Sequence, residues 1–118
     1  MTAVQNFNQV GQAYAAAAGY RTQREQEADV FHRVTGALKS ANGGGTVQRI
    51  RALADNRRLW MTVADLMRDP ANGLPAKLRA SILSVGIAVE REMDGDEPDF
   101  GFLIAVNEAI AAGLGGAR

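Results

Sequence analysis

The chain has 118 residues, and its 13 Lys and Arg balance 13 Asp and Glu, so it has no global charge to attract nucleic acid or an anionic membrane. This length predicts a single helical domain over residues 1–118 with one hydrophobic core. The chain has no cysteine, which excludes disulfides and thiolate chemistry and fits a reducing, cytoplasmic location.

Residues 1–20 are rich in alanine and carry a weak stripe at helical spacing, formed by Phe7, Val10 and Tyr14. They have neither a basic start nor an uninterrupted apolar stretch, so we expect no signal peptide. No apolar run approaches the roughly 18 residues of a membrane-spanning helix. The segment is expected either to form a short helix or to stay loose until something docks on it.

Four helices are predicted after this segment. Thr22 with Glu25 forms a capping-box pattern that opens the first helix, and the glycines of ANGGG (41–45) end it. Thr46 is the expected cap of the second helix, which ends near Asp69 because the residue before a proline avoids the helical region.

The third helix is expected to start at Pro75 and to run to Arg91 or Met93. Asp99 is a candidate cap for a fourth helix over residues 100–112, which Gly113 ends. No strand pattern competes, and every connection is short. The predicted fold class is therefore all-α: a compact antiparallel bundle of four main helices, with or without a short extra helix within residues 1–20.

Three polar residues are predicted to lie among apolar positions: Glu27, Arg57 and Asn107. A guanidinium near a core needs a partner, and no acid lies three or four residues from Arg57. Folding the first two helices about ANGGG brings Glu27 within reach, which predicts a partly buried Glu27–Arg57 ion pair. One interpretation is a structural network that fixes helix register, with Asn107 in it or bonded to a backbone carbonyl. The alternative is that Arg57 meets a carboxylate of a partner protein.

Arg58 is expected at the rim of the second helix, near Asp55 or Thr62, while Trp60 either packs in the core or contacts a partner. The third helix has two apolar stripes on different faces, so it is either central in the bundle or presents one face to a partner. The predicted partner-binding residues are Arg58, Trp60, Arg79, Ala80, Leu83 and Ile87.

The sequence predicts no catalytic, metal or cofactor site. His32 is the only histidine and falls on the polar side of its helix, which favours a solvated histidine over one in a catalytic triad. The acidic turn DGDEPD (94–99) lacks the spacing of a calcium loop. The glycines of ANGGG follow a helix rather than a strand, which argues against a phosphate-binding loop.

Five stretches, spaced in order along nearly the whole chain, resemble the FlaF family of flagellum biosynthesis regulators. They are AY (13–14), RTQREQEADVFHRVTGAL (21–38), ALADNRRLW (52–60), NGLPAKLRASILSVGIAVER (72–91) and FLIAVNEAIAAGL (102–114). The NRRLW, N-x-LP-x-x-LRA and LI-x-VN-x-x-I-x-x-GL segments are the most specific.

The resemblance implies a non-enzymatic protein that acts with flagellin, promoting its production and export, alongside a second small regulator, FlbT. A bundle with an exposed apolar groove suits a chaperone that covers amphipathic flagellin segments. The alternative is an RNA-binding regulator of flagellin message, but the arginines form no basic stripe with interleaved aromatics. An enzyme is the remaining, weaker alternative. No cofactor, direct nucleic-acid partner or membrane association is expected.

Overall fold

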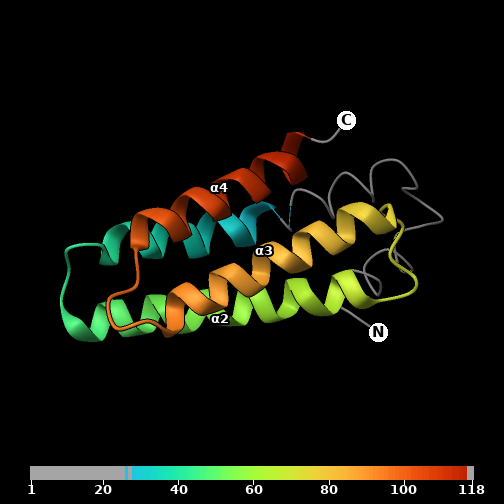
Figure 1. Cartoon of the computed structure of the whole chain (residues 1–118). Coiled ribbons are helices and arrows are strands. Elements are labelled where there is room, and N and C mark those ends of the chain that lie inside the picture. The colour runs from blue at the N-terminus through green and yellow to red at the C-terminus, as the bar shows by residue number, and fades with distance from the viewer. Residues whose placement is uncertain (1–25, 27, 117–118) are drawn as a thin grey trace.

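The computed structural model describes residue 26 and residues 28–116, and every regular element in that part of the chain is a helix (Figure 1). The first helix covers residues 28–41, followed by α2 (Thr46–Arg68), α3 (Ala76–Asp94) and α4 (Phe100–Gly116). Short connections make successive helices antiparallel. The predicted all-α antiparallel bundle is confirmed, while the extra helix considered for residues 1–20 lies outside the described residues.

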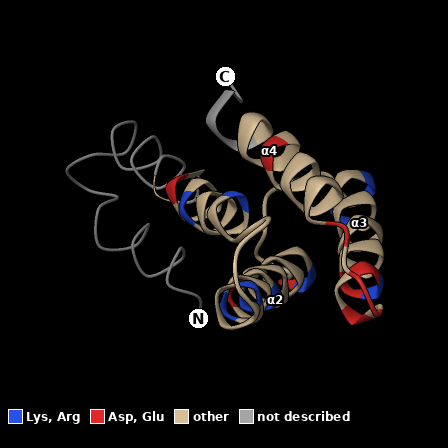
Figure 2. Ribbon diagram, turned by 90° about the vertical axis from the view of Figure 1, so that its left-hand side faces the viewer, with Lys and Arg blue, Asp and Glu red and all other residues tan. Residues whose placement is uncertain are grey.

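Seen end-on, the four helices form a ring in which the first helix neighbours α2 and α4, and α3 closes the other side (Figure 2). Phe31 and Trp60 join the first helix to α2, with ring centroids 6.1 Å apart in a T-shaped arrangement. Lys39 and Glu108 join the first helix to α4 through an ion pair of 2.7 Å. Glu108 is the single charged residue of α4, whose other residues are apolar or glycine apart from Asn107.

The connections follow the local sequence. Gly43, in the turn between the first helix and α2, takes a φ of +86°, a conformation that glycine adopts without steric cost. The expected cap at Thr46 is wrong: α2 starts at Thr46, and the cap position belongs to Gly45, which makes no side-chain cap bond. The predicted Asp99 cap is confirmed, since Asp99 Oδ1 accepts a hydrogen bond of 3.0 Å from the Phe102 amide.

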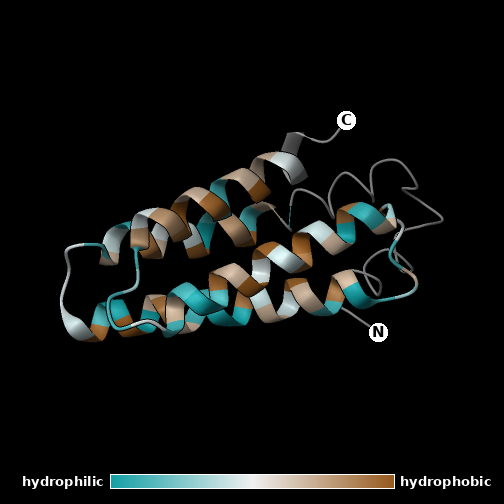
Figure 3. Ribbon diagram, in the orientation of Figure 1, coloured by the Kyte–Doolittle hydropathy of each residue, from teal (hydrophilic) through white to brown (hydrophobic). Residues whose placement is uncertain are grey.

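The core is built from all four helices, and hydrophobic residues recur along each of them (Figure 3). Helical spacing of apolar residues would place Ile50 and Met61 on the inner face of α2, but these residues are 60% and 55% exposed. The buried face of α2 is instead made of Ala52, Asn56, Leu59, Trp60, Val63 and Met67. That face includes an asparagine, so apolar periodicity alone pointed to the wrong side of the helix.

Candidate functional site

A chain of buried polar side chains links α2, α3 and α4. Trp60 Nε1 donates to Asn107 Oδ1 at 2.9 Å, and Asn107 Nδ2 donates to Asn56 Oδ1 at 2.7 Å. Asn56 Nδ2 in turn donates to the sulfur of Met93 at 3.4 Å. Both asparagines are fully buried, so each hydrogen bond replaces one that water would otherwise make. The chain fixes the orientation of the indole ring and the rotation of α4 against α2.

Gly86 lets α3 approach the face of this indole. A Cβ at position 86 would lie 3.3 Å from Trp60 Cε3, closer than most real contacts of that kind. Glycine inside a helix costs roughly 1 kcal/mol relative to alanine, so its presence there calls for a packing reason. The close α2–α3 contact supplies that reason.

A groove of about 270 Å³ lies between α2 and α3, with the buried Trp60 among the residues that line it. Leu83 is half-buried in its wall, whereas Met61 and Ile87 are 55% and 54% exposed on opposite helices. The complete lining is Trp60, Met61, Val63, Ala64, Asp65, Arg68, Ile82, Leu83, Gly86, Ile87 and Glu90. The groove therefore combines apolar side chains with charged residues of both signs.

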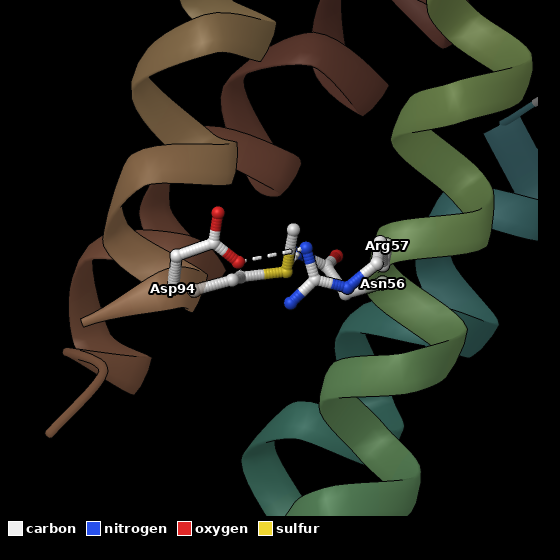
Figure 4. Close-up of polar contacts among 4 residues, drawn as sticks. Asn56, Arg57 and Asp94 are labelled. Carbon is white, nitrogen blue, oxygen red and sulfur yellow. Dashed lines mark hydrogen bonds and ion pairs between the residues drawn. The ribbon is translucent and has the colours of Figure 1, made fainter. Parts of the chain in front are cut away.

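One end of this groove is bounded by an ion pair. Arg57 Nη1 lies 3.0 Å from Asp94 Oδ1, so the guanidinium of α2 spans to the end of α3 (Figure 4). Arg57 precedes Met61 by four residues and Asp94 follows Glu90 by four, which places the pair one helical turn beyond the groove. The side chains are 39% and 66% exposed, so this is a surface contact.

The prediction for Arg57 needs correction. Its side chain is not in the core, because the inward position on that turn of α2 belongs to Asn56, beside it in the sequence. Its carboxylate partner among the described residues is Asp94, and Glu27, the partner expected from the sequence, lies outside those residues. Asn107, by contrast, is buried in a polar network as expected.

Arg79 is engaged at the opposite end of the α2–α3 pair. Its Nε donates to the Leu74 carbonyl oxygen at 3.1 Å, and its Nη1 donates to the Met67 carbonyl oxygen at 3.4 Å. These bonds satisfy carbonyl groups at the end of α2 and in the following loop. Arg79 and the exposed Ala80 are absent from the groove lining, so the structure does not gather them with the other predicted binding residues.

Arg58 lies on the other flank of α2. It pairs with Asp55 at 2.9 Å and lines a second groove of about 400 Å³ between the first helix and α2. Of the six predicted partner-binding residues, the α2–α3 groove thus brings together Trp60, Leu83 and Ile87. Met61 and Gly86 also line the groove but were not predicted as site residues from the sequence. The signal for Gly86 is that a glycine stands inside a helix.

The described residues hold no group of three or more side chains suited to a metal ion. His32 is exposed on the first helix. In the same part of the chain, no helix has the length and apolar character needed to cross a membrane.

Comparison with known proteins gives one match. The model of the family described as "Flagellar protein FlaF" matches residues 10–114, which is most of the chain. No curated protein and no solved structure matched. A match of this extent, running from residue 10 to the last turn of α4, shows that the chain belongs to the FlaF family of flagellar proteins.

Proposed function

We propose that this protein is a flagellin-binding chaperone and regulator of flagellum biosynthesis, which promotes flagellin production and export by covering amphipathic flagellin segments. The observation that carries the proposal is the groove between α2 and α3, where Met61 and Ile87 expose apolar side chains on opposite helices. Apolar side chains exposed on two facing helices, with charged residues around them, form a place where another protein can bind.

The groove has the size and chemistry for a helix-in-groove interaction. From Trp60 to Arg68 along α2 is about 12 Å at a rise of 1.5 Å per residue, which matches about two turns of a bound helix. Two turns present apolar anchors at positions i, i+3 or i+4, and i+7. Met61 adds an unbranched, polarizable side chain that adapts to different apolar partners. Asp65, Arg68 and Glu90 supply charges of both signs to orient the bound segment.

The direct test is co-elution of the purified chain with monomeric flagellin on a sizing column. Ile87→Glu should weaken binding about tenfold or more, because it removes apolar contact area and places a carboxylate against an apolar partner. Ser84→Glu is the matched control: it adds the same charge to the exposed surface of α3 but lies outside the groove lining. Its binding should stay close to that of the unmodified chain.

Ile87 is a better test position than Leu83. Ile87 is 54% exposed, whereas Leu83 is half-buried and packs against the core, so Leu83→Glu would disturb folding as well as binding. The thermal midpoint of Ile87→Glu should remain near that of the parent. Absence of a complex across a range of concentrations would overturn the proposal, and so would equal binding by both glutamate variants.

FlbT, the second regulator implied by the family resemblance, belongs in the same assay as an added component. A stable complex of the chain with FlbT and flagellin together would support the regulatory part of the proposal. Salt-sensitive binding to the leader of flagellin message, with no binding to flagellin itself, would instead favour an RNA-binding regulator.

A further inference from the structure

The second groove, between the first helix and α2, differs in chemistry from the α2–α3 groove. Val30, Val34, Ala37 and Leu59 give it an apolar lining, in which Val30 is 36% exposed and Leu59 lies at the buried base. Its principal opposite charges, Arg58 and Asp55, already pair with each other at 2.9 Å. The polar requirement of these two groups is thus met within α2, and the rest of the lining is apolar apart from the exposed Arg33 and Thr62 at the rim.

The sequence contains a segment that suits this surface. Residues 1–20 contain no Lys, Arg, Asp or Glu, although charged residues make up 22% of the chain as a whole. Phe7, Val10 and Tyr14 follow one another at helical spacing, which predicts a single apolar face if the segment is helical. An uncharged segment with one apolar face brings no charge into contact with the apolar lining.

The connection between segment and groove is short. The groove is lined from Val30 to Ala37 on the first helix, so it lies close to the residues at which the described structure begins. The 14 residues of chain that separate Tyr14 from residue 28 can reach at most about 45–50 Å when fully extended. The part of the first helix that lines the groove is only about 10 Å long, so the chain is long enough to reach it. The tether permits docking and holds the segment at an effective concentration near the millimolar range.

The family match gives a separate reason to assign the segment to the domain. The match to the family model starts at residue 10, so it includes Val10 and Tyr14 together with the described helices. We propose that residues 1–20 dock in cis, with Phe7, Val10 and Tyr14 against Val34 and Leu59. In this arrangement the groove between the first helix and α2 is occupied by the chain itself, and the α2–α3 groove stays open for a partner.

Paramagnetic labelling tests the proposal without needing to know the docking register. The chain has no cysteine, so Ala13→Cys provides a single attachment site for a nitroxide beside the apolar stripe. The methyl signals of Val34 and Leu59 should lose most of their intensity in the labelled protein. Those of Ile87, on the opposite flank of α2, should keep it.

Paired variants identify the contact that is responsible. Phe7→Ser together with Tyr14→Ser should restore the Val34 and Leu59 signals, because the apolar face is lost. Gln12→Ser lies on the opposite side of the predicted helix and should leave the broadening unchanged. A mixture of labelled and isotope-enriched chains separates docking in cis from docking on a second copy.

Three results would overturn the proposal: broadening that is equal on both flanks of α2, broadening that appears only between different molecules, and broadening that survives the double serine variant. None of these measurements involves flagellin. Failure of this proposal is therefore distinguishable from failure of flagellin binding at the α2–α3 groove.

Discussion

Replacing Asn107 with alanine should destabilise the bundle strongly. The substitution removes the acceptor of the Trp60 Nε1 hydrogen bond at 2.9 Å and the donor to Asn56 Oδ1 at 2.7 Å. Trp60 is 2% exposed and Asn56 is fully buried, so both groups would be left without water or protein partners. An unsatisfied buried polar group costs about 1–3 kcal/mol, and two of them cost about 2–6 kcal/mol.

A loss of this size is large against the roughly 5–15 kcal/mol that separates a folded domain from its unfolded state. For a domain of about 100 residues it corresponds to a fall in the thermal midpoint of about 8 °C or more. Urea denaturation followed by tryptophan fluorescence and by circular dichroism measures it, and the single tryptophan reports from within the network.

The neighbouring Glu108 provides the control for this experiment. Its ion pair with Lys39 also fixes α4, but to the first helix, and both side chains are about half exposed. Glu108→Ala should therefore cost no more than about 1 kcal/mol. If Asn107→Ala lost as little as Glu108→Ala, the buried chain of hydrogen bonds would not be what holds α4 in register with α2.

Three further substitutions separate packing from surface contacts. Gly86→Leu should lower the free energy of unfolding, measured by heat or urea, by about 1–3 kcal/mol and should weaken flagellin binding. The reason is that even a Cβ at this position would lie 3.3 Å from the Trp60 ring. An unchanged midpoint would contradict the close packing of α2 and α3. Arg57→Ala should cost at most about 1 kcal/mol in urea denaturation, since its pair with Asp94 is largely exposed, and a larger loss would contradict that placement. Arg79→Ala should lower stability by about 1–2 kcal/mol while leaving flagellin co-elution unchanged, because its bonds go to backbone carbonyls and not to the groove; lost co-elution with intact stability would reverse this assignment.

The fold class and most of the helix limits could be predicted because they depend on local signals. The end of α4 could not, since the helix continues to Gly116 past the stop expected at Gly113. Gly43 at the first turn and Asp99 at the start of α4 act through their own backbone geometry and hydrogen bonds, which sequence spacing reveals. Leu83 and Ile87 were also identified from one helix alone, as apolar residues off the main stripe of α3. Their meeting with Trp60 and Met61 depends on the packing of two helices, which the sequence does not show directly.

The faces of α2 could not be predicted for a physical reason. Its exposed positions include Val47, Ile50 and Met61, whereas a fully buried position is taken by an asparagine. A prediction from hydrophobic periodicity assumes that apolar residues face inward, so it assigned the buried face of α2 to the wrong side of the helix. The same error placed Arg57 in the core. Its carboxylate partner among the described residues, Asp94, is 37 residues away at the C-terminal end of α3, and spacing alone could not pair the two.

The polar residues around the α2–α3 groove act chiefly on its shape. Arg57 with Asp94 at one end, and Arg79 with the Met67 carbonyl at the other, each connect the two helices or their termini. Between these contacts Trp60 is held by Asn107. These contacts hold the two helices of the groove together beyond both of its ends, and the hydrogen bond to Asn107 fixes the indole orientation. Side chains that are already ordered lose little conformational entropy when a partner binds, so binding is less costly. In the proposed function, the NRRLW segment would therefore act mainly by fixing the buried Trp60 beneath the groove, while its two arginines make surface ion pairs with Asp94 and Asp55.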